Sequence, residues 1–242
     1  MTTGRNVVTS RALVDAVSTA LGSVFSGLLL VLLLGGGWLV QTAGVVVGVV
    51  VPTVAAMSIL RRTPLIVTGA DRVTLLRGVL TGACATIVVL SLADVMPLRS
   101  WPLFALALPA VFLDAVDGWV ARRSNNASPA GGRLDMETDA ILLMILSVPL
   151  AWSVGPWVLG IGAMRYLFVA ASWLRPVLRR QLAFSQFRRI VAGTQGVVLV
   201  AAVMPVLPVP AAAAATGTAL VLLVISFGKD IVTLERASSE GS

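Results

Sequence analysis

The sequence predicts an all-α, polytopic integral membrane protein. Of its 242 residues, 57% are hydrophobic and only 12% are charged, which is about half the charged share of a typical soluble domain. Apolar runs long enough to cross a bilayer, roughly 20 residues each, follow one another along the chain. A water-soluble fold could not cover this much apolar surface, so most of the chain must face lipid or other buried helices.

Eight apolar runs, separated mostly by short connections with turn residues, are predicted to form membrane-spanning helices. They cover residues 20–40, 42–60, 73–93, 101–121, 136–153, 156–174, 190–206 and 211–228. With a cytoplasmic N-terminus, nearly all Arg and Lys residues of the connections fall on the cytoplasmic side, and Arg99 alone falls outside. The positive-inside rule therefore predicts a multi-pass protein of the inner (plasma) membrane with both termini in the cytoplasm.

The residue types that are missing or rare exclude several chemistries. The chain has no histidine and a single cysteine, Cys84, so Ser/His and Cys/His catalysis, histidine-bound metals and an intrachain disulfide are all excluded. The net charge of +7 follows from the cytoplasmic excess of Arg and Lys, and no nucleic-acid partner is expected. Any chemistry must use carboxylates, arginines, hydroxyls or bound metal.

Acidic side chains gather in one short stretch of the chain. Asp114 and Asp117 lie three residues apart near the cytoplasmic end of one predicted helix, and Asp135 and Asp139 lie four apart near the start of the next. Both spacings place the two carboxylates on one helix face. A short helical hairpin can therefore bring all four carboxylates together at one membrane depth.

Four clustered carboxylates repel one another unless a cation lies among them. Oxygen ligands without histidine or cysteine favour Mg²⁺ or Mn²⁺, which proteins commonly hold together with substrate phosphates. Two such ions bridging a diphosphate would stabilise both the attacking and the leaving oxygens of a displacement. Gly118 and Ala121 leave space for a nucleotide to approach the backbone.

The acidic stretch reads Asp114-x2-Asp117-Gly118-x2-Ala121-Arg122-x8-Gly131-x3-Asp135-x3-Asp139. This pattern resembles the signature of the CDP-alcohol phosphotransferase (CDP-alcohol phosphatidyltransferase) family, and the chain is most similar in character to bacterial phosphatidylglycerophosphate synthase-like members. The resemblance implies a six-helix catalytic core over residues 67–232 and a homodimer. The preceding residues 1–66 are then an extension with two further helices, and residues 233–242 are expected to form a disordered tail.

The resemblance also implies the roles of individual residues. Asp114, Asp117 and Asp135 would bind metal, and Asp139 would act as the general base on the acceptor hydroxyl and also contact metal. A second, weaker match runs from Ala70 to Arg77, where Thr74 and Arg77 fit the pattern Pro-Asn-x-x-Thr-x-x-Arg; the alternative is a helix start capped by Asp71. The nucleotide-binding set is then Asp114, Asp117, Gly118, Ala121, Arg122, Gly131 and Thr74.

Two arginines are candidates for holding a phosphate of the acceptor. Arg165 lies within a predicted span after Gly162, as in phosphatidylglycerophosphate-type relatives, and the alternative is a structural pair with Asp139 or a carbonyl. Arg189 aligns with a phosphate-binding stretch of the same relatives together with Ser185 and Gln195; the alternative is an anchor at anionic headgroups. Val191 and Ala192 depart from that stretch. The acceptor therefore stays open among glycerol phosphate, inositol phosphate, serine and other alcohols.

The predicted reaction is metal-dependent transfer of a phosphatidyl-type group from CDP-diacylglycerol to a small polar alcohol, with release of CMP. Some relatives instead use a water-soluble CDP-alcohol as donor and a diacylglycerol as acceptor, and the pattern fits both. Two further alternatives are a membrane transporter, in which the acidic residues would serve a proton or cation path, and an inactive homologue kept as a scaffold.

Overall fold

The computed structural model describes residues 2–61, 69–124, 129–175 and 186–239, and for residues 2–11, 70, 115–124, 129–130, 174 and 234–239 it describes the backbone alone. Its helices are α1 (Thr2–Leu34), α2 (Trp38–Leu60), α3 (Gly69–Leu92), α4 (Trp101–Ser124), α5 (Pro129–Ser153), α6 (Leu159–Leu174), α7 (Gln186–Val203) and α8 (Val209–Ser239), with a 3₁₀ turn, η1, at Pro156–Val158. The described residues contain no strand, and the predicted all-α class is confirmed.

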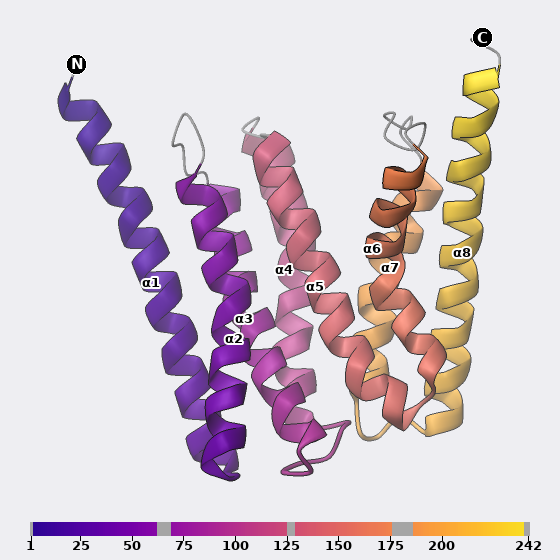
Figure 1. Ribbon diagram of the computed structural model, residues 1–242, viewed down its shortest axis with the longest axis horizontal. Coiled ribbons are helices and arrows are strands. Elements are labelled where there is room, and N and C mark those ends of the chain that lie inside the picture. The colour runs from indigo at the N-terminus through magenta and orange to yellow at the C-terminus, as the bar shows by residue number, and fades with distance from the viewer. Residues whose placement is uncertain (1, 62–68, 125–128, 176–185, 240–242) are drawn as a thin grey trace.

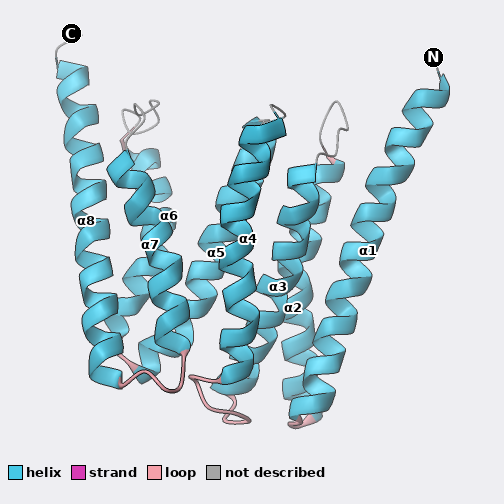
Figure 2. Ribbon diagram, turned by 180° about the vertical axis from the view of Figure 1, so that it is seen from behind, coloured by secondary structure: helices cyan, strands magenta, loops and turns pink. Residues whose placement is uncertain are grey.

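The helices run alternately up and down between two ends of the bundle (Figure 1). Helix α1 begins and α8 ends at the same end, which we call the terminal end (Figure 1). The opposite end, called the far end, holds the loops that join α1 to α2, α3 to α4, α5 to α6 and α7 to α8 (Figure 2). This alternation is the arrangement of a chain that crosses a bilayer repeatedly.

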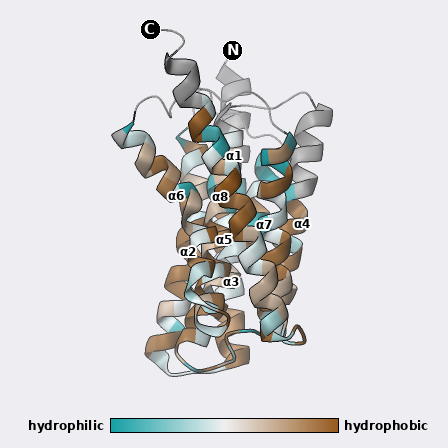
Figure 3. Cartoon of the chain, turned by 90° about the vertical axis from the view of Figure 1, so that its right-hand side faces the viewer, coloured by the Kyte–Doolittle hydropathy of each residue, from teal (hydrophilic) through white to brown (hydrophobic). Residues whose placement is uncertain are grey.

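Length and composition of the helices show a multi-pass membrane protein. In the described part of the chain, four segments are long and apolar enough to cross a membrane, and they cover Ala12–Leu34, Trp38–Leu60, Asp71–Leu92 and Val209–Thr233. A shorter apolar segment covers Trp101–Asp114. Hydrophobic residues dominate the length of the bundle, whereas hydrophilic residues gather toward the terminal end (Figure 3).

The first connection lies several residues earlier than the hydropathy predicted. The expected spans 20–40 and 42–60 place the turn at residue 41, but α1 ends at Leu34 and α2 begins at Trp38. Gly35 and Gly36 have φ values of 81° and 109°, a backbone conformation that costs glycine little and other residues much. The glycines therefore set the turn, and apolar composition alone cannot locate it.

The last helix is also longer than predicted. Helix α8 continues to Ser239, whereas the sequence was expected to give a span over 211–228 and a disordered tail over 233–242. A helix can extend beyond a bilayer without apolar residues, so hydropathy does not mark its end. Residues 240–242 of that tail lie outside the described part of the chain.

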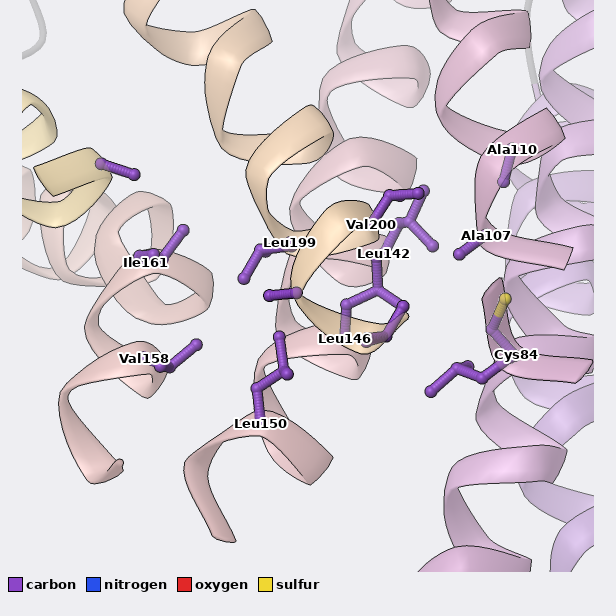
Figure 4. Close-up of a cluster of buried hydrophobic side chains, with 14 of the residues drawn as sticks. Cys84, Ala107, Ala110, Leu142, Leu146, Leu150, Val158, Ile161, Leu199 and Val200 are labelled. Carbon is purple, nitrogen blue, oxygen red and sulfur yellow. The ribbon is translucent and has the colours of Figure 1, made fainter. Parts of the chain in front are cut away.

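The main core fills the space between α3 and the helices that follow it. Figure 4 shows part of it, including Cys84 of α3, Leu146 of α5 and Leu199 of α7, and all three side chains are fully buried. Val158 of η1 and Ile161 of α6 extend this core toward α8. The core thus joins the six helices α3 to α8 and the 3₁₀ turn, and it fixes α4 and α5, which carry the aspartates.

Helices α2 and α3 approach each other closely through glycines. A Cβ atom on Gly82 would lie 2.0 Å from the carbonyl oxygen of Gly48, and one on Gly48 would lie 2.2 Å from Oγ1 of Thr86. Thr86 Oγ1 donates a hydrogen bond to the Gly44 carbonyl at 3.0 Å. Small residues allow such contact between membrane helices, so the N-terminal extension is packed tightly against α3.

At the far end, Arg99 links two loops. Its Nε donates to the Ala202 carbonyl and its Nη2 to the Met204 carbonyl, both at 2.7 Å, and Nη2 also contacts the Leu207 carbonyl. The last carbonyls of a helix lack partners within that helix, so Arg99 caps the C-terminal end of α7 and fixes it against the connection between α3 and α4.

Candidate active site

Three of the predicted aspartates come together between α4 and α5. Asp114 of α4 and Asp135 and Asp139 of α5 each offer a carboxylate oxygen, and these oxygens lie within 4.8 Å of one another. The side chains are 41%, 31% and 36% exposed, respectively. We call these residues the carboxylate cluster. Such proximity is costly without a neighbouring positive charge.

Arg77 of α3 supplies a positive charge to this cluster. Its guanidinium Nη1 lies 3.3 Å from Asp114 Oδ1, and it also contacts the carboxylates of Asp135 and Asp139. The Arg77 side chain is only 1% exposed. Its positive charge therefore lies inside the protein, behind the partly exposed carboxylates. Helices α3, α4 and α5 thus each contribute charged side chains to one site.

The donor set fits a divalent metal of the kind that the sequence suggests. Clustered carboxylate oxygens without nitrogen or sulfur ligands match the preference of Mg²⁺ and Mn²⁺. The partial exposure of the three carboxylates leaves them accessible on the side that Arg77 does not cover. Asp117, the fourth predicted ligand, lies on α4, and its side chain is outside the described part.

The other predicted nucleotide-binding residues lie on the same three helices as Arg77 and the carboxylate cluster. Thr74 is buried on α3, one turn before Arg77, and Gly131 lies in the first turn of α5. The backbones of Gly118, Ala121 and Arg122 belong to the last turns of α4, but their side-chain positions lie outside the described part.

Two cavities meet at Asp139. A narrow one of about 50 Å³ is lined by Arg77, Asp114 and Asp139. The other has a volume of about 260 Å³ and lies between α5, α6, α7 and α8. We call it the Asp139 cavity. Its polar wall residues are Asp139, Arg165, Arg188, Gln195 and Ser226, and its other side chains are apolar.

The arginines of the Asp139 cavity differ from the predicted pair. Arg165 lines it and forms an ion pair with Glu137, and Arg188 lines it and lies 3.1 Å from Asp230. Arg189 instead lines a separate cavity of about 520 Å³ beside Gln186 and Thr194. In the described part of the chain, Arg165 therefore pairs with Glu137 and not with Asp139, the partner that the sequence offered as an alternative.

Arg77 and Gln195 match family patterns in the sequence, but neither they nor Arg188 were assigned a role in the predicted site. Arg77 had a usable signal, because an arginine within an apolar helix needs a charged partner. Arg188 and Arg189 are adjacent, so their different directions depend on the rotation of α7, which the sequence does not specify.

Replacing Arg77 with Met should destabilise the metal-free protein and make it depend more on metal. Breaking a buried ion pair costs about 3–5 kcal/mol, and the partial exposure of these carboxylates reduces this to about 2 kcal/mol. We expect Tm in EDTA to fall by roughly 5 °C. Added Mn²⁺ should raise the Tm of the variant more than that of the wild type, because it relieves carboxylate repulsion.

The matched control for this measurement is Arg72→Met on the same helix. Arg72 is 59% exposed and pairs with Asp15 at 3.1 Å, so its loss should change Tm little. An Arg77→Met variant with the wild-type Tm in EDTA would show that Arg77 does not stabilise the cluster.

Comparisons with known proteins agree with this arrangement. Residues 67–227 match the CDP-alcohol phosphatidyltransferase family. The chain is also 40% identical, over 75 residues, to CDP-diacylglycerol–inositol 3-phosphatidyltransferase 1 of Arabidopsis thaliana, and this match covers 31% of the chain and 33% of the plant protein. No solved structure matches. Because the family match covers most of the chain and includes the whole carboxylate cluster with Arg77, the protein belongs to the CDP-alcohol phosphatidyltransferase family.

Proposed function

We propose that the protein transfers a phosphatidyl group from CDP-diacylglycerol to a small polar alcohol and releases CMP. The observation that carries this proposal is the position of Asp139, which lines both the narrow cavity at the carboxylate cluster and the larger Asp139 cavity. A general base must lie within hydrogen-bond reach of the acceptor hydroxyl, and that hydroxyl must lie beside the reacting phosphorus. In this proposal the diphosphate binds at the carboxylate cluster and the acceptor binds in the Asp139 cavity, so that Asp139 would lie between the two substrates.

In the proposed reaction, the Asp139 carboxylate takes the proton of the acceptor hydroxyl. That oxygen forms a bond to the phosphorus nearer the lipid, the bond from this phosphorus to the bridging oxygen breaks, and CMP leaves with the electron pair. Asp114, Asp117 and Asp135 would hold Mg²⁺ or Mn²⁺ together with Asp139, and the metal would neutralise charge on the diphosphate. Arg77 orients the cluster from the protein side through its contacts with three of these carboxylates.

The acceptor is a phosphorylated alcohol in this proposal. Arg165 and Arg188 both line the Asp139 cavity, and the guanidinium fork suits phosphate oxygens. The Arg165 Nε is buried and has no hydrogen-bond partner among the described residues, so it retains a donor for such an oxygen. The name of the plant relative indicates an inositol acceptor for that protein, and a cyclic polyol phosphate is one candidate here.

The proposed orientation places the carboxylate cluster on the cytoplasmic face of the membrane. Basic residues predominate near the connections at the terminal end, where Arg61 follows α2 and Arg72 lies in the first turn of α3. Cytoplasmic loops carry this excess. Water-soluble acceptors and CMP would then exchange with the cytoplasm, while the lipid stays in the bilayer.

The test is CMP release by the purified protein in detergent with CDP-diacylglycerol and Mn²⁺ or Mg²⁺. The acceptors are glycerol 3-phosphate, inositol 1-phosphate, free inositol and serine. We expect release that requires both metal and a phosphorylated acceptor. Equal release with free inositol would contradict the phosphate requirement. No release with any acceptor from folded protein would refute the proposed donor, and activity with CDP-choline and diacylglycerol would establish the reversed arrangement.

A further inference from the structure

The amide of Gln195 is a buried polar group beside the proposed base. Gln195 lies on α7, its side chain is 1% exposed, and it lines the Asp139 cavity together with Asp139 and Arg165. Polar groups at such depth nearly always have a partner. The bonds of this amide therefore show what it can still bind.

The nitrogen of the amide is fully used. Nε2 donates to the Val191 carbonyl of its own helix at 3.1 Å and to the Ala219 carbonyl of α8 at 3.2 Å. Both partners are acceptors, so they fix which end of the amide is nitrogen. The two N–H bonds are committed, and Gln195 cannot donate to a ligand.

The amide oxygen is still able to accept a hydrogen bond. Oε1 is buried and has no hydrogen-bond partner among the residues that the structure describes. Leaving a buried acceptor unsatisfied costs about 1–3 kcal/mol. The cavity of about 260 Å³ can hold water in the free protein or a small polar molecule in its place. A ligand that satisfies Oε1 must bring a hydrogen-bond donor, such as a hydroxyl group.

We propose that Gln195 is a specificity-determining residue that accepts a hydrogen bond from a second hydroxyl of the acceptor. This inference rests on the proposed function. Asp139 takes the attacking hydroxyl, Arg165 and Arg188 hold the phosphate, and Gln195 Oε1 binds another hydroxyl. The site then selects a polyol phosphate over a phosphate ester with a single hydroxyl. An amino alcohol is disfavoured, because its ammonium group would lie near two arginines.

The first experiment uses the wild-type protein and compares kcat/KM for three acceptors. Glycerol 3-phosphate and inositol 1-phosphate are the polyol phosphates, and 3-hydroxypropyl phosphate is glycerol 3-phosphate without its central hydroxyl. We expect at least one polyol phosphate to exceed 3-hydroxypropyl phosphate by about tenfold, the effect of one hydrogen bond to a buried group. CMP release without such a preference overturns the role of Gln195 and leaves the proposed function intact.

The second experiment compares Gln195→Leu with the wild type. We expect kcat/KM for the preferred polyol phosphate to fall about tenfold, while the value for 3-hydroxypropyl phosphate changes less than about threefold. Equal losses for both acceptors would show that Gln195 only joins α7 to α8. Gln195→Met repeats the test if the Leu variant does not fold. Thr216→Val is the control, because Thr216 is buried on α8 and donates to the Ala212 carbonyl at 2.8 Å. No CMP release from the wild type would refute the proposed function and this inference with it.

Discussion

Replacing Asp135 with Asn is expected to lower metal-dependent CMP release by about 10³-fold. Asn has the size of Asp but no negative charge, so the cluster loses one of its anionic ligands. A bound metal supplies several kcal/mol of charge stabilisation to a transferring phosphoryl group, and each 1.36 kcal/mol corresponds to about a tenfold change in rate. Arg77 keeps its contacts with Asp114 and Asp139, so we expect the variant to remain folded.

The measurement is a Mn²⁺ titration of CMP release, with Asp94→Asn as the matched control. Asp94 is exposed in the connection after α3, with a φ of 57° that Asn also tolerates. The control should keep the wild-type rate and the wild-type dependence on Mn²⁺. If Asp135→Asn kept both as well, the carboxylate cluster would not be the metal site.

The carboxylate cluster shows how far spacing in the sequence can predict a site. Residues three or four apart share a helix face, and a short hairpin limits how far two adjacent helices can separate. These constraints are local, and the structure brings Asp114, Asp135 and Asp139 together. The contribution of α3 is not local, because Arg77 comes from a different helix, 37 residues before Asp114 in the printed sequence.

The Asp139 cavity shows where sequence reasoning stops. Which of Arg188 and Arg189 faces Asp139 depends on how α7 is rotated against α5 and α8, and the packing of the core sets that rotation. The unsatisfied oxygen of Gln195 is likewise visible only after the Val191 and Ala219 carbonyls are known to occupy its nitrogen. Hydropathy locates helices but does not determine such pairings.

Replacing Gly82 with Ala is expected to destabilise the protein strongly, although Ala is the better helix former. The added Cβ would lie 2.0 Å from the Gly48 carbonyl oxygen and 3.2 Å from Pro52 Cδ, whereas ordinary contact begins at 3.4 Å. Helices α2 and α3 would have to separate, and the Thr86 hydrogen bond to Gly44 would be lost. We expect a cost of about 3 kcal/mol and a fall in Tm of roughly 10 °C.

This change should also reduce activity, because α3 carries Arg77 five residues before Gly82. Near the terminal end, Ala55 and Ile59 of α2 pack with Leu75 of α3 and Leu134 of α5 in a second core cluster. Leu134 directly precedes Asp135 in the chain. The two N-terminal helices therefore support α3, which carries Arg77, and α5, which carries two aspartates of the carboxylate cluster. Both N-terminal helices lie outside the family match.

The control for Gly82→Ala is the same substitution at Gly217 of α8, where an added Cβ meets nothing within 4 Å. There, Ala should raise stability by up to about 1 kcal/mol, because it restricts the unfolded chain and favours a helix. Thermal unfolding in detergent, followed by tryptophan fluorescence, should thus give shifts of opposite sign for one chemical change. Equal shifts would mean that α2 does not contact α3 at Gly82. A lower Tm for Gly82→Ala with unchanged CMP release from its folded fraction would mean that the N-terminal helices stabilise the bundle without positioning Arg77.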